Sequence, residues 1–357
     1  MKNIRFDPNT LSTPYYIVDE HLLIRNLEIL ESVMDRTGCK ILLAQKAFSM
    51  YALYPLIGRY LSGTAASGLF EARLGREEMG GEVWAAMAIT EPGFGSDSAA
   101  VTTTAIRDGD EYVINGEKIF VTAGSRASHI VVWASVDRSL GRAAIKSFVV
   151  PRDHPGVTVA RLEHKLGIKA SDTAVIRFED CRIPASFLLG SPEVDVKKGF
   201  GGVMQTFDNT RPMVAAMAVG VGRAALEELR SLLTEAGVEV DYDRPAADQH
   251  AAAAEFIRLE AEWEASYLMT LRAAWMADNK EPNSLEASMS KAKAGRTVTE
   301  VTNKAVELAG TVGYSERLLL EKWARDSKIL DIFEGTQQIQ QLIIARRVLG
   351  KSSAELK

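Results

Sequence analysis

This 357-residue chain has few cysteines and no excess of basic residues, and its apolar runs are short. No apolar stretch approaches the roughly 20 residues that span a bilayer, and the opening MKNIRFDPNT lacks the apolar core of a signal peptide. The formal net charge is −5, which argues against a nucleic-acid partner. We therefore expect a protein with neither a membrane nor a nucleic acid as its partner.

The chain holds two cysteines, Cys39 and Cys181, and they make no metal-binding motif. Free thiols, in the core or on the surface, are the favoured interpretation of such residues. This usage is typical of a reducing compartment, so we expect a cytoplasmic protein without a metal site.

The composition, 46% hydrophobic and 25% charged, is that of an ordinary globular protein and predicts two or three domains. Three sequence patterns follow one another, over residues 1–83, 84–195 and 196–357. We take these ranges as the expected domains.

Short apolar runs alternate with helical periodicity over residues 1–83. The expected strands cover residues 15–18, 40–47 and 63–67. The first expected helix begins near Glu20, and two more cover residues 50–61 and 69–79. This order predicts three parallel βα units. Lys46 in the second strand has two interpretations: it extends to the rim of the strand layer, or it forms a Schiff base with a cofactor aldehyde.

Short strands without helices between them fill residues 84–195. They are expected over residues 85–90, 102–107, 112–114, 118–122, 129–135, 144–150, 157–161 and 173–178. Asp108-Gly109 and Asn115-Gly116 lie between alternating runs and are strong hairpin signals. The pattern predicts an antiparallel β-domain, a small barrel or sandwich.

Two turns of this β-domain are rich in hydroxyls and glycine. Residues 90–97, TEPGFGSD, offer backbone amides and hydroxyls that can bind a flat heterocycle or a phosphate. Thr122 starts a second such turn with Ala123-Gly124-Ser125. Each turn alone is a weak signal, because most glycine-rich turns bind nothing.

Residues 196–357 are helical in pattern. Four long helices, over residues 199–234, 246–278, 284–308 and 317–348, predict an antiparallel bundle. Asp208 and Arg211 lie three residues apart and face the same way on the first helix. They form either a local salt bridge or an anchor for a polar arm of a ligand.

Glu334 is the one carboxylate in an apolar run near the C-terminus, IFEGTQQI. Apolar neighbours solvate a carboxylate poorly, so we expect a raised pKa and a usable base near neutral pH. Gly335 permits close approach of a ligand, and Thr336 can cap the helix that follows. The plainer alternative is a glutamate at a helix start in a capping arrangement.

Four stretches in this order, ITEPGFGSD, NGEKIFVTAG, FDNTRP and IFEGTQQIQQLIIAR, resemble the acyl-CoA dehydrogenase family, and HKLGIKASDTAVIRFEDCRIP adds to the likeness. The resemblance covers about residues 84–357. It implies a flavin-binding β-domain, a C-terminal four-helix bundle and FAD as cofactor. It also implies dehydrogenation of an acyl-CoA to the 2-enoyl-CoA, an electron-transfer flavoprotein as electron acceptor, and a homo- or hetero-oligomer.

Carried over residue by residue, the resemblance makes Glu334 the catalytic base. It implies flavin contacts from Ala88, Ile89, Thr90, Ser96, Phe120, Val121, Thr122, Thr336 and Gln337. The family usually has Trp where this chain has Phe120. The acyl-CoA is expected to contact Ser96, Asp208, Arg211 and Gly335.

Residues 13–83, with TPYYIVDE, ILLAQKAFSM and TAASGLFEARLGREEMGGEV, resemble the start of carboxynorspermidine decarboxylase. That resemblance implies part of a pyridoxal-phosphate-binding, alanine-racemase-like barrel, with Lys46 as its Schiff-base lysine. Three βα units cannot close a barrel, so we expect Lys46 to be vestigial. The expected fold is therefore an α+β multidomain chimera, in which a partial βα-barrel fragment replaces the helical N-terminal domain of the dehydrogenases.

Two further stretches depart from the dehydrogenase pattern. An Arg-and-Phe-Gly motif is absent where this chain has VEVDYDRPAADQH, and a glycine-rich segment reads VELAGTVGY from Val306. In the family these motifs bind FAD across a subunit interface. Three alternatives therefore stay open: an acyl-CoA dehydrogenase impaired by these changes, a pyridoxal-phosphate decarboxylase fragment, and an inactive scaffold.

Overall fold

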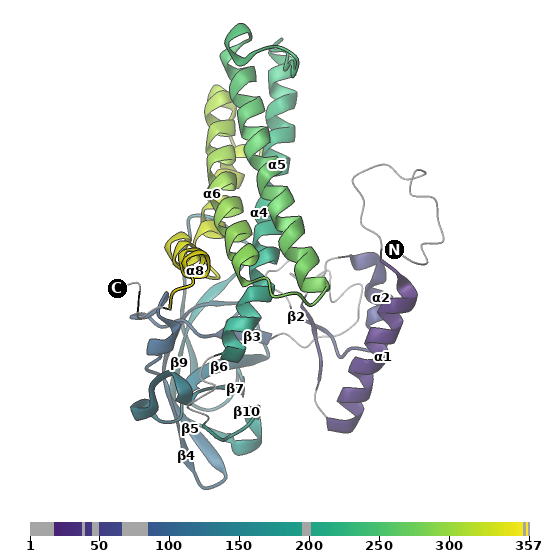
Figure 1. Cartoon of the computed structure of the whole chain (residues 1–357). Coiled ribbons are helices and arrows are strands. Elements are labelled where there is room, and N and C mark those ends of the chain that lie inside the picture. The colour runs from purple at the N-terminus through teal and green to yellow at the C-terminus, as the bar shows by residue number, and fades with distance from the viewer. Residues whose placement is uncertain are drawn as a thin grey trace. The chain divides into compact units, whose positions relative to one another are not determined.

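The computed structural model describes residues 18–37, 40–44, 50–65, 85–194, 201–352 and 355 (Figure 1). The chain forms two compact units, one from the residues before Ala85 and the other essentially from Ala85–Lys357. Lys46, Cys39 and the predicted helix 69–79 lie outside the described residues, as does most of the predicted strand 15–18.

The N-terminal unit contains helix α1 (Glu20–Thr37), the short helix α2 (Tyr54–Ile57) and two strands, β1 (Leu43–Ala44) and β2 (Thr64–Ala65). The strands pair in parallel, and Leu27, Tyr54, Ile57 and Leu61 form a small buried core. The predicted helix 50–61 is wrong in extent: it is a 3-10 turn, Tyr51–Leu53, followed by one helical turn. The described part gives no support to a barrel fragment.

The second unit begins with an eight-stranded sheet in the order β10-β7-β6-β4-β5-β9-β8, with β3 paired to β6. The strands are β3 (Ala85–Ala88), β4 (Thr104–Asp108), β5 (Glu111–Thr122), β6 (His129–Ser135), β7 (Ile145–Pro151), β8 (Val157–Leu162), β9 (Thr173–Pro184) and β10 (Leu188–Leu189). Most pairs are antiparallel, as predicted, but β3 and β4 each pair in parallel with β6. Long connections before β6 allow this, because a parallel pair cannot be joined by a tight turn.

One of the two predicted hairpins forms. Asp108 pairs with Glu111 across a tight turn in which Gly109 has a φ of +62°, so the β4–β5 hairpin is confirmed. Asn115-Gly116 instead lies inside β5, at a register shift against β9, and the hairpin prediction there is wrong. A Cβ on Gly116 would lie 2.4 Å from the Thr103 hydroxyl, so this glycine serves a close approach between segments.

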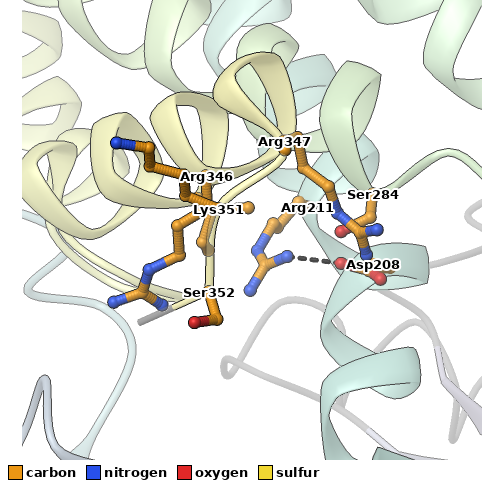
Figure 2. A pocket seen from close by; sticks show the side chains of 9 residues that line it. Asp208, Arg211, Ser284, Arg346, Arg347, Lys351 and Ser352 are labelled. Atoms are coloured by element: carbon orange, nitrogen blue, oxygen red, sulfur yellow. Dashed lines mark hydrogen bonds and ion pairs between the residues drawn. The ribbon is translucent and has the colours of Figure 1, made fainter. Parts of the chain in front are cut away.

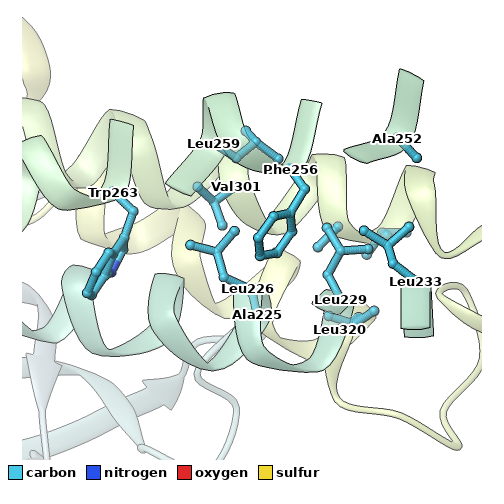
Figure 3. Close-up of a cluster of buried hydrophobic side chains, with 12 residues drawn as sticks. Ala225, Leu226, Leu229, Leu233, Ala252, Phe256, Leu259, Trp263, Val301 and Leu320 are labelled. Atoms are coloured by element: carbon cyan, nitrogen blue, oxygen red, sulfur yellow. The ribbon is translucent and has the colours of Figure 1, made fainter. Parts of the chain in front are cut away.

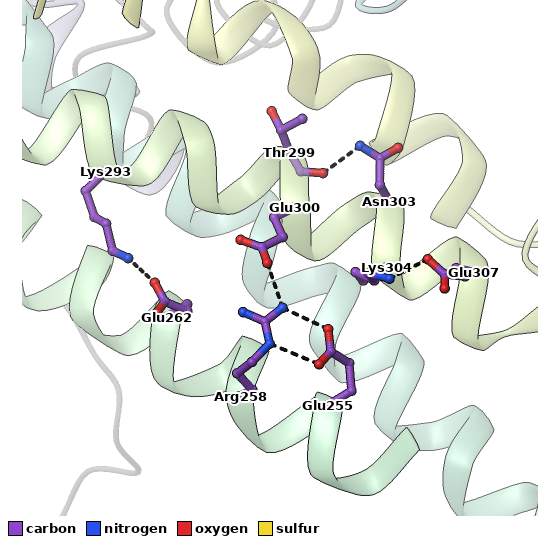
Figure 4. Close-up of polar contacts among 9 residues, drawn as sticks. All are labelled: Glu255, Arg258, Glu262, Lys293, Thr299, Glu300, Asn303, Lys304 and Glu307. Atoms are coloured by element: carbon purple, nitrogen blue, oxygen red, sulfur yellow. Dashed lines mark hydrogen bonds and ion pairs between the residues drawn. The ribbon is translucent and has the colours of Figure 1, made fainter. Parts of the chain in front are cut away.

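Three long helices follow: α4 (Gly201–Glu235), α5 (Ala251–Asp278) and α6 (Ser284–Leu308). They pack against one another through a buried apolar cluster that includes Leu229 of α4, Phe256 of α5 and Val301 of α6 (Figure 3). Ion pairs on the outside join the helices as well, for example Arg258 of α5 to Glu300 of α6 at 2.6 Å (Figure 4). Exposed pairs contribute about 0–1 kcal/mol each, so the apolar cluster dominates.

The predicted fourth helix, residues 317–348, is wrong as one element. It consists of α7 (Leu320–Ser327), a 3-10 turn η8 (Lys328–Asp331) and α8 (Gln337–Leu349). The break falls at Glu334 and Gly335, whose φ values are +56° and +95°. A left-handed pair cannot continue an α-helix, so the chain turns at the residue singled out from the sequence.

The loop between β8 and β9 contacts α7 through a glycine. Gly167 packs so closely on α7 that a Cβ there would lie 2.2 Å from the Arg325 carbonyl oxygen. The Ile168 amide donates to Asp326 at 2.5 Å. Among the helices described, none combines the length and the apolar content that a bilayer crossing requires.

Candidate active site

The Glu334 turn joins η8 to α8 and presents a carboxylate. Thr336 is the N-cap of α8, and its hydroxyl accepts from the Ile339 amide at 3.4 Å, as predicted. Glu334 precedes that cap by two residues and has left-handed backbone, which is uncommon for a residue with a side chain. It is therefore not the capping residue of the plainer alternative.

The surroundings of Glu334 differ from the apolar pocket expected from the sequence. The Thr210 hydroxyl of α4 donates to Glu334 Oε2 at 2.9 Å. Arg211 of α4 and Lys291 of α6 both interact electrostatically with the same carboxylate. The carboxylate thus has a hydroxyl donor and two cationic groups as neighbours, contrary to the prediction from the flanking isoleucines.

Lys291 is buried, with an exposed fraction of 0%, and its Nζ donates to the Gly335 carbonyl oxygen at 2.7 Å. Burial lowers the pKa of Lys291 to about 8, against the opposing pull of Asp331 and Glu334 and with a small further lowering by Arg211. Burial likewise lowers the pKa of Arg211, opposed by Asp208 and Glu334.

A cavity of about 590 Å³ opens beside α4 and α8 (Figure 2). Its lining residues are Asp208, Arg211, Ser284, Ile343, Arg346, Arg347, Gly350, Lys351 and Ser352. Four of these side chains are cationic and one is a carboxylate, so the cavity suits an anion such as a phosphate. Arg211 Nη1 also lies 2.5 Å from Asp208 Oδ1, so the predicted local salt bridge forms at the wall of the cavity.

A second group of predicted residues lies where two strand segments meet in the β-domain. Ala88 ends β3, and the Thr90 carbonyl accepts from the Ile119 amide of β5 at 2.9 Å. Phe120 follows with a φ of +58° and 60% of its surface exposed. The irregular stretch of β5 thus turns this ring outward, next to the segment that carries Thr90.

The remaining predicted residues differ in burial. Val121 is fully buried, whereas Thr122 and Ser96 are exposed. Gln337, at the start of α8, is 8% exposed, and no donor from the described part of the chain reaches its Oε1. A buried amide oxygen of this kind is a candidate for a ligand contact.

A buried ion pair that the sequence analysis missed holds the segment of Thr90 in place. Glu91 accepts hydrogen bonds from the amides and hydroxyls of Thr102 and Thr103, at 2.5 to 2.9 Å. Lys118 Nζ lies 2.8 Å from Glu91 Oε1 and also donates to the Ile89 carbonyl at 3.1 Å. The only sequence signal was a lone lysine in an alternating strand.

The charge states of this pair follow from its contacts. Burial alone would raise the pKa of Glu91, but the hydrogen bonds from Lys118, Thr102 and Thr103 outweigh it and lower that pKa to about 2. Burial lowers the pKa of Lys118, against the pull of Glu91. Because Glu91 has donors besides the lysine, the carboxylate is the better-satisfied partner.

Comparison with known proteins gives two family matches, one to the β-domain of the second unit and one to its helical part. Residues 86–181 match the family model of the acyl-CoA dehydrogenase middle domain, and residues 197–349 match that of the acyl-CoA dehydrogenase C-terminal domain. A β-domain followed by a helical domain of these types defines the class. The chain belongs to the acyl-CoA dehydrogenase family.

Two relatives illustrate the likeness. The mitochondrial short-chain specific acyl-CoA dehydrogenase of Bos taurus is 40% identical over 262 residues, which are 73% of this chain and 62% of that protein. A subunit of the caffeyl-CoA reductase–Etf complex of Acetobacterium woodii is 36% identical over 266 residues, 74% of this chain and 68% of that protein. The chain thus spans less than two thirds of the bovine relative's length.

Solved structures of acyl-CoA dehydrogenases also resemble this chain. Butyryl-CoA dehydrogenase from Megasphaera elsdenii superposes with a TM-score of 0.70 at 27% identity, covering 93% of this chain and 91% of that one. A glutaryl-CoA dehydrogenase from Mycobacterium smegmatis, in complex with FADH2, gives a TM-score of 0.69 at 25% identity, covering 87% and 75%.

Proposed function

We propose that this protein is an FAD-dependent acyl-CoA dehydrogenase, which converts an acyl-CoA thioester to the 2-enoyl-CoA. The observation that carries the proposal is the Glu334 carboxylate, presented by a left-handed turn and hydrogen-bonded by Thr210 beside a cationic cavity. The relatives, which are named for acyl-CoA substrates, support the same reaction class.

The residues present fit a flavin. Phe120 offers an outward-facing aromatic ring beside Thr90, and Gln337 keeps a buried amide oxygen that lacks a donor in the described chain. We assign the cofactor contacts to Ala88–Thr90, Ser96, Phe120–Thr122, Thr336 and Gln337. A bound FAD supplies the acceptor for the β-hydrogen of the substrate and its electron pair.

The acyl-CoA is proposed to place its anionic part at the cavity of Arg211, Arg346, Arg347 and Lys351. Arginine forks bind phosphate oxygens in pairs, and Asp208 holds the Arg211 fork in a fixed orientation at 2.5 Å. Asp208 and Arg211 therefore anchor the CoA, with Ser96 and Gly335 as the further predicted contacts.

The chemistry assigned to Glu334 is proton transfer. The thioester carbonyl acidifies the proton on Cα, and a positioned carboxylate can remove it. As that proton passes to Glu334, the electron pair of the Cα–H bond forms the new double bond, and hydrogen leaves Cβ with its own pair. The Thr210 hydroxyl orients the carboxylate, which avoids reorganisation during the transfer.

We propose an electron-transfer flavoprotein as redox partner, a homo- or hetero-oligomeric assembly, and a cytoplasmic location. The Etf complex named for the Acetobacterium relative supports the partner. Exposed Leu268, Leu271 and Trp275 on α5 support an assembly that covers them. The buried free thiol of Cys181, whose pKa burial raises to about 11, is consistent with a reducing compartment.

For residues 13–83 we propose an origin in a pyridoxal-phosphate barrel, with Lys46 vestigial and the whole chain a chimera. Both dehydrogenase family models begin after these residues. Borohydride reduction with pyridoxal phosphate tests it: labelling of Lys46 would mean that the lysine is still functional.

The function is tested by the visible spectrum of the purified protein, before and after anaerobic addition of butyryl-CoA and palmitoyl-CoA. A flavin band that bleaches with an acyl-CoA establishes a dehydrogenase and gives its preferred chain length. Absence of a flavin band, even after incubation with FAD, refutes the proposal and favours the inactive scaffold.

A further inference from the structure

One face of α6 contacts the whole segment that leads to Glu334. Lys291, Gly295, Val298 and Thr302 recur at helical spacing and therefore share a side of the helix. Thr302 Oγ1 lies 3.0 Å from Ser327 Oγ at the end of α7, and Val298 packs with Leu330 of η8 in a buried cluster. Successive turns of this face of α6 therefore contact successive parts of the segment from α7 to the Glu334 turn.

Gly295 brings the helix and η8 into close contact. A Cβ at this position would lie 2.9 Å from the Leu330 carbonyl oxygen and 3.1 Å from Asp331 Cα. Lys291 lies one turn earlier on the same face and reaches past η8 to the Gly335 carbonyl, at 2.7 Å. The lysine therefore contacts the backbone one residue beyond Glu334.

The Glu334 turn needs such contacts. Left-handed backbone is unfavourable for a residue with a side chain, so it persists only where neighbours fix it. Gln340 Nε2 donates to the Glu334 carbonyl at 3.1 Å and to the Gly335 carbonyl at 3.0 Å. Lys291 adds a charged donor to this turn, at the Gly335 carbonyl.

We propose that Lys291 is a positioning residue for Glu334: it fixes the left-handed turn through the Gly335 carbonyl, and its ammonium group attracts the carboxylate and thereby orients it. The proposal rests on the proposed function, because it concerns the base of that reaction. It adds a residue that contacts neither the substrate nor the cofactor in the roles given above.

The charge of Lys291 depends on pH in the range where the enzyme would work. The groups that face it are Asp331 of η8, Glu334 of the turn and Arg211 of α4. Its pKa of about 8 means that the ammonium is present below pH 8 and is lost above it. We therefore expect turnover to fall above pH 8, since the neutral amine still donates a hydrogen bond but no longer attracts the carboxylate.

Two variants separate the hydrogen bond from the charge. Lys291→Gln keeps a neutral donor, and Lys291→Met keeps the length of the side chain but neither property. We expect kcat at pH 7 to fall at least tenfold in Lys291→Met and less in Lys291→Gln, with KM changed by less than threefold. Both should lose the alkaline limb near pH 8. Lys293→Met, which removes the neighbouring partly exposed lysine bound to Glu262, is the matched control and should keep it.

The coupling can also be measured without turnover. In protein labelled with [ζ-15N]lysine, the Nζ resonance that is absent from Lys291→Met should titrate near pH 8, and its midpoint should fall by at least half a pH unit in Glu334→Gln. A midpoint that does not move in Glu334→Gln overturns the proposal, whether or not the protein is a dehydrogenase. An alkaline limb that survives in Lys291→Met, in an active enzyme, overturns it as well. A moving midpoint in a protein that binds no flavin would instead refute only the proposed function.

Discussion

Glu334 combines an uncommon backbone conformation with three polar neighbours, Thr210, Arg211 and Lys291. If it is the base, Glu334→Gln keeps the shape and the hydrogen bond from Thr210 but cannot accept the α-proton. We expect kcat to fall by roughly 10³-fold, within the range typical of a general base. The flavin absorbance and the thermal midpoint should be unchanged.

The control for this variant is Glu316→Gln, at an exposed position on the segment before α7. Turnover measured by dye reduction should be unaffected there. Loss of flavin together with activity in Glu334→Gln would contradict the assignment of Glu334 as a base, because it would show a role in holding the cofactor.

Glu91 and Lys118 form a buried ion pair, and Glu91 has further hydrogen-bond donors in Thr102 and Thr103. Removing one member of such a pair costs about 3–5 kcal/mol when the other is left without a partner. Glu91→Gln leaves the Lys118 ammonium buried without its carboxylate, so we expect the free energy of unfolding to fall by about 3 kcal/mol. Lys118→Met should cost less, because Glu91 keeps the donors of Thr102 and Thr103.

The pH dependence of stability gives this pair a second test. The folded pKa of Glu91 is about 2, below its ordinary value of 4.5. Its stabilisation is therefore fully present above about pH 5 and is lost as the pH falls toward 2. Urea unfolding between pH 6 and pH 3 should show a smaller decline for Glu91→Gln than for the wild type. Parallel curves for the two proteins would exclude Glu91 as a source of the acid sensitivity.

At the scale of elements, α6 supports the Glu334 turn, and Gly295 lies where α6 and η8 are in close contact. Gly295→Ala raises helix propensity by about 1 kcal/mol but places a Cβ 2.9 Å from a backbone oxygen, which cannot move aside as a side chain can. We expect a net loss of about 1–2 kcal/mol in stability. A greater than tenfold loss of kcat should accompany it, because η8 and Glu334 must shift.

Gly220→Ala on α4 is the matched control, since a Cβ there meets no atom within 4 Å. It should stabilise the protein by about 0.5–1 kcal/mol and leave kcat unchanged. Equal behaviour of the two variants in thermal unfolding and turnover would show that the α6–η8 contact is not tight.

Local patterns predicted elements well where the cause of an element is local. The strand His129–Ser135 and the helix Ser284–Leu308 have the bounds that periodicity indicates, and Asp108-Gly109 forms its hairpin. Asn115-Gly116 carries the same signal but does not turn, because Gly116 packs on Thr103, thirteen residues upstream in the segment before β4. Tertiary contacts decided that position, and no local pattern records them.

In the candidate site too, local patterns predicted some features and tertiary contacts decided the others. The apolar run around Glu334 singled out this residue, and the family resemblance assigned it as the base. Periodicity suggested one helix through it, yet the chain turns there because Lys291 and Gln340 fix a left-handed conformation. Thr210, Glu91 and Lys118 were missed because their partners lie 11 to 124 residues away in sequence. Such contacts follow from the three-dimensional packing of elements and not from spacing along the chain.

At the scale of the whole molecule, the two units have separate cores. The N-terminal unit packs around Leu27, Tyr54, Ile57 and Leu61, whereas the clusters of α4, α5 and α6 draw on residues after 200 alone. Each described strand of the eight-stranded sheet pairs within residues 85–189. The buried clusters and the strand pairs described in the second unit are thus formed by residues of that unit.

Deletion of residues 1–83 should therefore leave the second unit folded. We expect a soluble protein with a single cooperative thermal transition, and a far-UV circular dichroism spectrum dominated by the helices of α4, α5 and α6. Incubation with FAD then separates folding from function: retention of the flavin would show that the second unit is sufficient to bind it. Aggregation of the truncated protein, beside a soluble full-length chain, would mean that the N-terminal unit covers apolar surface of the second and is needed for its stability.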